Sequence, residues 1–123
     1  MLDHLGFAVS DFQASRAFYA TALEPLGISV LMEFGEHAGF GRDGKAAFWI
    51  GRGGKPPGGR LHLAFTARNR EEVRAFHAAA LAAGATDNGE PGLRPDYHPH
   101  YYGAFVIDLN GHNIEAVCHS PEA

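Results

Sequence analysis

The stretch His4-Leu5-Gly6-Phe7 recurs 58 residues later as His62-Leu63-Ala64-Phe65. The likeness continues without a gap into the following segment, so that nine of the twenty residues in 4–23 are identical to their counterparts at this offset. An ungapped match of this density indicates two copies of one structural unit. The repeat therefore decides the architecture, and the rest of the sequence is interpreted within it.

We expect the two copies to form two modules of one domain. The chain has 123 residues, which is the usual size of a single domain, and we assign all of 1–123 to it. The first module covers about residues 1–53 and the second about 60–119. Between them, residues 52–60 are rich in glycine and proline, a composition typical of a linker and incompatible with a helix or a central strand.

Each module begins with an alternating strand followed by a helix. Apolar residues alternate with small or polar ones over 3–9 and again over 61–66. Asp11 and Asn69 then stand where helix N-caps are expected, and apolar residues at helical spacing follow both. A glycine ends each helical pattern, at Gly27 in the first module and at the corresponding point in the second.

Three strand-like segments complete each module, with Asp43-Gly44 and Asn110-Gly111 as hairpin turns. The predicted order is thus β-α-β-β-β, twice. We expect an α+β fold in which the paired modules form a curved, cup-like mixed sheet with the helices outside. The predicted strands of this group are 28–34, 37–42, 46–51, 85–93, 101–108 and 112–118.

Composition and charge narrow the function classes. Apolar residues make up 46% of the chain and charged residues 20%, which is ordinary for a globular domain. The net charge is −4 and no Lys/Arg-rich run is present, so we expect no nucleic-acid partner. No apolar stretch has membrane-spanning length, and the N-terminus lacks the pattern of a secretion signal. We therefore expect a cytoplasmic protein without a membrane partner, and its single cysteine excludes an internal disulfide.

The two histidines of the repeat occupy the same position in equivalent strands. Alternation places His4 and His62 opposite the apolar row of each strand, beside small residues that would leave a cavity. The last strand carries Glu115 on the corresponding face, and a carboxylate in an apolar strand is costly unless it is paired or bound to a metal. Two imidazoles and one carboxylate predict a facial triad for one divalent ion, which could be Fe, Mn, Zn, Ni or Co.

A plainer interpretation exists for each of these residues taken alone. A strand histidine is most often a hydrogen-bonded structural residue, and a glutamate in a final strand is often exposed at an edge. The repeat changes this weighing in favour of the metal site, because the two histidines share one symmetry-related position.

The segment 94–102 is dense in groups that donate or accept protons. It precedes the strand expected to cross the cup, where binding residues are common. A histidine could serve there as a general base and a tyrosine could bind an oxyanion. We select His100 and Tyr102 as candidates for contact with the substrate or with the metal ligands. The alternative is a surface loop held by aromatic packing. Strand alternation allows only one of Tyr101 and Tyr102 to point into the cup.

The opening strand, its repeat and the ending Asp108-Leu109-Asn110-Gly111-His112-Asn113-Ile114-Glu115 resemble the vicinal oxygen chelate superfamily. That group includes glyoxalase I, bleomycin-resistance proteins, fosfomycin-resistance proteins and extradiol dioxygenases. The ending is similar to the family pattern Asp-Pro-Asp-Gly-Asn-x-x-Glu, with Leu109 in place of proline. The resemblance covers essentially the whole chain. It implies paired β-α-β-β-β modules, often a homodimer with cups built within or between subunits, and a metal that chelates two adjacent oxygens of a small-molecule substrate.

The first module departs from the pattern of glyoxalase I. Aligning the modules on Gly44 and Gly111 places Phe48 at the position of Glu115. In enzymes resembling glyoxalase I, this first-module position supplies a fourth ligand, a carboxylate that also serves as a base. An apolar ring can do neither, which disfavours a methylglyoxal–glutathione isomerase. Three protein ligands resemble instead the extradiol dioxygenase and fosfomycin-resistance arrangements.

Two function classes remain open. The first is a divalent-metal-dependent enzyme of the glyoxalase/dioxygenase group, acting on a small molecule with vicinal oxygens by lyase, isomerase or dioxygenase chemistry. The second is a non-catalytic protein that binds a small molecule or drug, as bleomycin-resistance proteins do. Bleomycin-binding members often lack the metal triad, so its presence here favours the enzyme.

Overall fold

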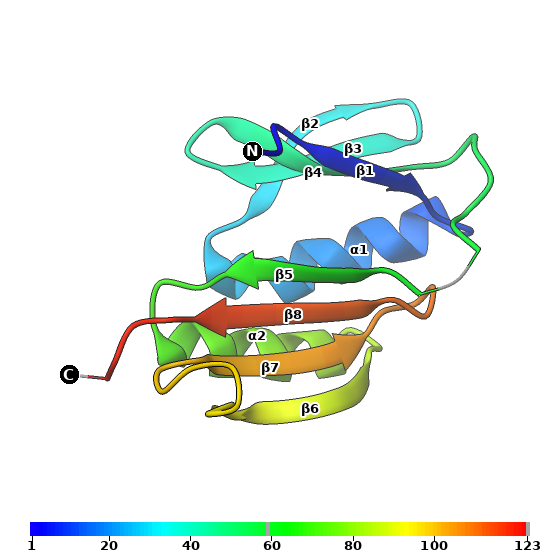
Figure 1. The fold of residues 1–123 in the computed structure, drawn as a ribbon. Helices are drawn as coiled ribbons and strands as arrows, with labels where there is room; N and C mark the ends of the chain where they lie inside the picture. The colour runs from blue at the N-terminus through cyan, green and yellow to red at the C-terminus, as the bar shows by residue number, and fades with distance from the viewer. Residues whose placement is uncertain (59, 123) are drawn as a thin grey trace.

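A computed structural model describes residues 1–58 and 60–122. Gly59, in the predicted linker, and Ala123, at the end of the predicted domain, lie outside the described residues. Figure 1 shows the chain passing through two modules one after the other. The elements in chain order are β1 (Leu5–Ala8), α1 (Phe12–Leu23), a 3-10 turn (Glu24–Leu26), β2 (Ser29–Phe34), β3 (His37–Arg42), β4 (Lys45–Gly51), β5 (His62–Thr66), α2 (Arg70–Ala82), β6 (Thr86–Leu93), β7 (Tyr102–Ile107) and β8 (Asn113–Cys118).

The predicted α+β fold with two β-α-β-β-β modules is confirmed. The first module forms a sheet of order β1-β4-β3-β2, and the second repeats it as β5-β8-β7-β6. In each sheet the first strand runs parallel to the last strand of its module, and the remaining pairs are antiparallel. The two sheets are separate and open, so β1 and β5, the repeated strands, each lie at a sheet edge.

Both helices begin where the sequence predicts, but α1 ends at Leu23, and the 3-10 turn continues to the predicted end at Gly27. The Asp11 carboxylate accepts a hydrogen bond from the backbone N–H of Ala14, and Asn69 caps α2 in the same way. At the end of the first helical segment, Gly27 adopts φ 76, a left-handed conformation that favours glycine. Neither helix combines the length and the apolar character needed to cross a bilayer within the part of the chain that the structure describes.

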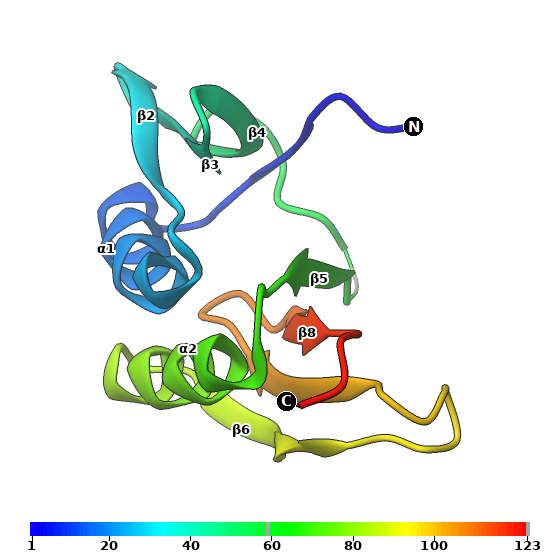
Figure 2. The same cartoon turned by 90° about the vertical axis from the view of Figure 1, so that its left-hand side faces the viewer.

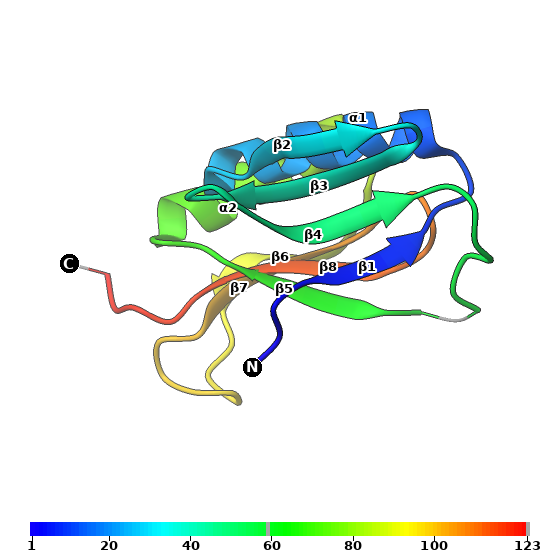
Figure 3. The same ribbon diagram turned by 90° about the horizontal axis from the view of Figure 1, so that it is seen from above.

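One hydrophobic core is shared by the two modules. Phe48 and Ile50 of the first sheet lie in the same buried cluster as Val106 and Ile114 of the second. Figures 2 and 3 show α1 and α2 together along one side of the molecule, with β1 and β5 on the other. Because each sheet buries one face in this common core, its opposite face is turned away from the core. Polar side chains on the outer faces are therefore the candidates for a binding site.

A buried hydrogen bond ties α1 to the second module. Tyr19 is completely buried, and its hydroxyl donates to the carboxylate of Asp108 at the end of β7. The other Asp108 oxygen accepts from the backbone N–H groups of Asn110 and His112, each at 2.9 Å. Burial, together with the nearby Asp108 charge, raises the pKa of Tyr19 well above its ordinary value, so the hydroxyl stays protonated and remains a donor.

Replacing Tyr19 tests this link between the modules. Tyr19→Phe keeps the ring and removes the donor, so one oxygen of buried Asp108 loses its partner. We expect the free energy of unfolding, measured by urea denaturation, to fall by about 1–3 kcal/mol. Tyr97→Phe is the matched control, because that tyrosine is exposed, and it should change stability by less than about 0.5 kcal/mol. Equal stability of Tyr19→Phe and the native protein would contradict the account.

Candidate metal site on the second sheet

The outer face of the second sheet carries a buried carboxylate. Register pairs Glu115 of β8 with Ala64 of β5 on one side and with Phe105 of β7 on the other. Ile114 and Ala116, its neighbours along the strand, point into the shared core. Glu115 is nevertheless only 1% exposed, although it lies on the face opposite the core. A carboxylate so shielded from water needs partners close by.

Two side chains contact this carboxylate, one at each oxygen. His62 Nε2 lies 3.2 Å from Glu115 Oε1, and the Tyr101 hydroxyl donates a hydrogen bond to Oε2. Gly103 makes room for the group, because a Cβ atom there would lie 3.1 Å from Oε2. The His62 ring stacks on Phe105 at 6.2 Å, which holds the imidazole over the sheet. The three groups therefore converge on one point of the outer face.

His62 and Glu115 together are suitable ligands for a divalent ion. Imidazole nitrogen and carboxylate oxygen are the usual protein ligands of zinc and of the neighbouring transition metals. His62 remains about half exposed, at 52% of its side chain, so an ion between His62 and Glu115 would be open to solvent and to a substrate. The residues present thus fit two positions of the predicted triad.

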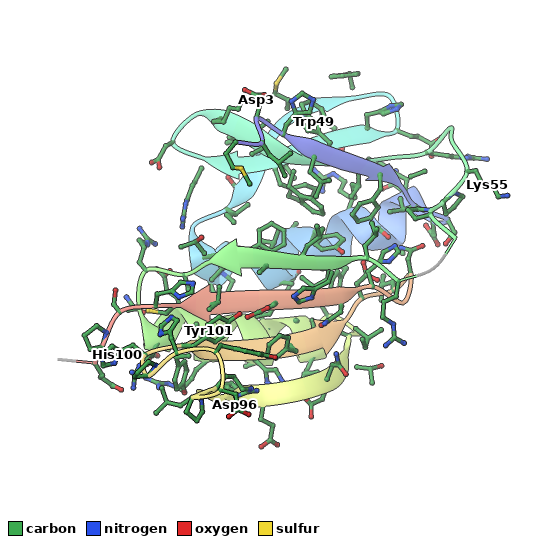
Figure 4. The ribbon with its side chains drawn as sticks, in the orientation of Figure 1. Asp3, Trp49, Lys55, Asp96, His100 and Tyr101 are labelled. Atoms are coloured by element: carbon green, nitrogen blue, oxygen red, sulfur yellow. The ribbon has the colours of Figure 1, made fainter. Side chains whose placement is uncertain are left out.

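The third predicted ligand lies elsewhere in the same chain. His4 precedes β1, its side chain is 62% exposed, and its Nδ1 lies 2.8 Å from Asp3 Oδ1. Asp3 is at the first module in Figure 4, well separated from Tyr101 beside the second sheet. Within residues 1–58 and 60–122, no group of three or more His, Cys, Asp or Glu side chains could hold a metal ion. A single copy therefore brings together His62 and Glu115 without His4.

The first-module counterpart of Glu115 is Trp49, and the assignment to Phe48 was wrong. Gly6 of β1 pairs with Trp49 of β4, just as Ala64, its repeat partner, pairs with Glu115. Phe48 instead lies on the core face, where it is 4% exposed. The conclusion drawn from Phe48 carries over, because an indole also provides neither a metal ligand nor a carboxylate base.

Of the two adjacent tyrosines, Tyr101 lies at the site. Its ring packs against His98 and His119, and burial, followed by the hydrogen bond to Glu115, raises the pKa of its hydroxyl well above the ordinary value. Tyr102 occupies the other face, where its hydroxyl accepts a hydrogen bond from Arg74 at 3.1 Å. His100 is exposed on the loop before Tyr101, and Figure 4 shows it farther out than Tyr101.

The sequence matches the family model described as Glyoxalase/Bleomycin resistance protein/Dioxygenase superfamily over residues 1–116. A search of curated proteins found no match.

Solved structures are similar over nearly the whole chain. A glyoxalase/bleomycin resistance protein from Albidiferax ferrireducens T118 has 30% identity and a TM-score of 0.79, covering 95% of this chain and 97% of its own. A putative glyoxalase from Bacillus halodurans has 25% identity and a TM-score of 0.71, with 96% and 95% covered. A glyoxalase/bleomycin resistance protein/dioxygenase family enzyme from Burkholderia phytofirmans PsJN, at 19% identity and a TM-score of 0.72, covers 96% and 98% and supports the fold.

A substitution at Glu115 tests whether the buried negative charge lowers the free energy of unfolding. In the metal-free protein, Glu115→Gln keeps the shape of the side chain and removes a buried charge, so we expect the free energy of unfolding to rise by about 1–2 kcal/mol. Urea denaturation in the presence of a chelator measures it. Glu90→Gln, at an exposed glutamate of the same module, is the control and should change little. A less stable Glu115→Gln protein would mean that Tyr101 and His62 already compensate the charge.

Proposed function

This chain belongs to the Glyoxalase/Bleomycin resistance protein/Dioxygenase superfamily, and on that basis we propose that it is a divalent-metal-dependent enzyme acting on a small molecule with two adjacent oxygens. The observation that carries the proposal is the shielded Glu115 carboxylate beside His62 on an open sheet face. A carboxylate that is shielded from water and lies beside an imidazole is a group that can bind a cation or take part in chemistry.

We further propose that a second copy of the chain supplies His4. Both sheets bury their inner faces in one core, so the face near His4 and the face of Glu115 are each turned outward. In this proposal, a second copy of the chain completes each of these half-sites. The exposed edges of β1 and β5 support this arrangement, because unpaired strand edges favour association with another copy. A homodimer would then hold two equivalent sites.

The residues around the site have separable roles in this proposal. When bound, the ion would supply Lewis-acid stabilisation of negative charge on a substrate oxygen. His62 and Glu115 Oε1 would bind it, together with the partner's His4. Tyr101, kept protonated by its raised pKa, would hold Glu115 Oε2 and so orient the carboxylate. We propose that His100 contacts the substrate from the exposed loop. Tyr101, rather than Tyr102, is the tyrosine that contacts the metal ligands.

The reaction type is proposed only at the level of its class. A lyase of the glyoxalase type and a dioxygenase of the extradiol type both use a metal ion with free coordination positions, where adjacent substrate oxygens bind. Trp49 stands where a fourth, carboxylate ligand would be needed, which favours chemistry based on three protein ligands. A metal ion with free coordination positions also allows isomerase chemistry.

A non-catalytic binding protein is the second candidate. It is favoured by the place of His4, which lies outside the His62–Glu115 pair in a single copy. Such a protein would bind its ligand in the same outward face and would need no metal. Metal retention separates the two candidates without any knowledge of the substrate.

Mixed dimers provide the test. We expect native protein to retain about one divalent ion per chain, and His4→Ala and His62→Ala each to retain almost none. A dimer of one His4→Ala chain with one His62→Ala chain has one intact site and one doubly broken site. Isolated with two different affinity tags free of histidine, this dimer should hold about one ion, measured by elemental analysis.

The alternative proposals predict a different metal content. A site within one chain would leave the mixed dimer empty, because each chain would lack a ligand. Native protein that retains no ion after reconstitution, while still folded, would favour the binding protein. His37→Ala is the control variant, because this exposed histidine lies outside the proposed ligand set and should retain the native amount of metal.

A further inference from the structure

A mainly apolar hollow lies between the two modules, which we call the intermodule hollow. Its volume is about 480 Å³, within the range of cavities that bind small molecules. The first module lines it with Leu5, Phe40 and Phe48, and β5 of the second module lines it with Leu63 and Phe65. The rings of Phe48 and Phe65 meet edge to face across the modules, with centroids 5.3 Å apart. The hollow therefore has apolar walls from both modules.

The intermodule hollow stays open because both modules present an edge strand to it. β1 and β5 each pair with one strand only in the part of the chain that the structure describes, and Figure 1 shows β5 as the strand of the second module that lies toward the first. Leu63 of β5 pairs in register with Ile114 of β8, so the two side chains point to the same side. Ile114 is completely buried, whereas Leu63 is only half-buried. The apolar row at this edge therefore lacks a complete cover.

One positive charge at the intermodule hollow has no acidic partner. Arg42 lines the hollow and donates to the backbone oxygens of Leu26, at 2.9 Å, and Thr66, at 3.4 Å. These carbonyl groups hold the guanidinium in place without neutralising it. Lys45, which also lines the hollow, is paired with Asp3 at 2.7 Å, whereas Arg42 forms no ion pair within residues 1–58 and 60–122. Arg42 therefore offers a single uncompensated charge beside the apolar walls.

We propose that the intermodule hollow binds an apolar molecule that carries one carboxylate, with its apolar part between the modules and its carboxylate on Arg42. Contact with Leu63 and the rings of Phe40 and Phe65 would remove apolar surface of both partners from water. The backbone oxygens occupy only part of the donor set of Arg42, so its fork keeps N–H groups for a carboxylate. This binding goes beyond the proposed function, because none of its contacts requires a metal ion.

Titration with octanoate, octanol and octylammonium tests the proposal, because the three share an apolar chain and differ in charge. The titrations are done with a chelator present, since His62 also lines the hollow and a carboxylate could otherwise bind an ion there. By calorimetry, octanoate is expected to bind saturably, octanol about tenfold more weakly, and octylammonium more weakly still. In carbon-labelled protein, the methyl signals of Leu5 and Leu63 should shift with octanoate, and those of Leu81, exposed on α2, should not.

Two variants address the charge and the space separately. Arg42→Gln should weaken octanoate binding by about tenfold and leave octanol binding unchanged. Ala47→Leu keeps Arg42 and adds bulk at an exposed position that lines the hollow, so it should weaken the binding of both molecules. Arg52→Gln is the control, because this exposed arginine is paired with Glu36 and lies outside the lining, and it should bind octanoate as the native protein does.

Three results would overturn the inference. Equal affinity for octanoate and octanol would mean that Arg42 does not select a carboxylate. Octanoate binding that appears only in metal-loaded protein would place the carboxylate on the ion, which would support the metal site and exclude the hollow. Leu63 signals that change with protein concentration and not with octanoate would mean that a second copy of the chain covers the hollow. Saturable, Arg42-dependent binding in metal-free protein would support the inference whether or not the proposed enzyme is correct.

Discussion

The shared core between the two modules determines where chemistry can take place on this chain. Phe48 and Ile50 from one sheet and Val106 and Ile114 from the other are buried together, so neither sheet can turn its second face inward. The repeated histidines and the carboxylate all belong to those second faces. Each copy consequently presents two outward faces of different composition: one with His4 and Trp49, the other with His62 and Glu115. Their outward orientation follows from packing, because burial of the apolar rows drives the modules together.

Most of the fold could be predicted because it depends on local signals and on the repeat. The caps at Asp11 and Asn69, the glycines after the helices and the alternating strands each require only neighbouring residues. The match between residues 4–23 and 62–81 then predicted two modules, with His4 and His62 at equivalent positions. That Glu115 lies on the outer face also followed from alternation alone. The spatial relation between the modules did not, because long-range packing leaves no local pattern.

The two misplaced aromatic residues, Phe48 and Tyr102, share one physical cause. A two-residue turn at Asn110-Gly111 would have paired Val106 with Glu115 and put Tyr102 on its face, whereas the actual register pairs Phe105 with Glu115 and places Tyr101 there. In the first module, an irregularity between Phe40 and Gly41 shifts the register by one and exchanges Phe48 for Trp49. A shift of one residue moves every side chain to the other face of a strand. Turn residues alone do not reveal such a shift.

The central claim is that a metal ion joins two copies of the chain at His62, Glu115 and the partner's His4. The most direct measurement is an anomalous-difference map from crystals of the protein loaded with Co or Zn. The account predicts one strong peak per chain, within bonding distance of His62 Nε2 and Glu115 Oε1 of one copy and of an imidazole nitrogen of His4 from the other. A peak at the adjacent His98–His119 pair instead, or His4 left in solvent beside an occupied His62–Glu115 site, would contradict it.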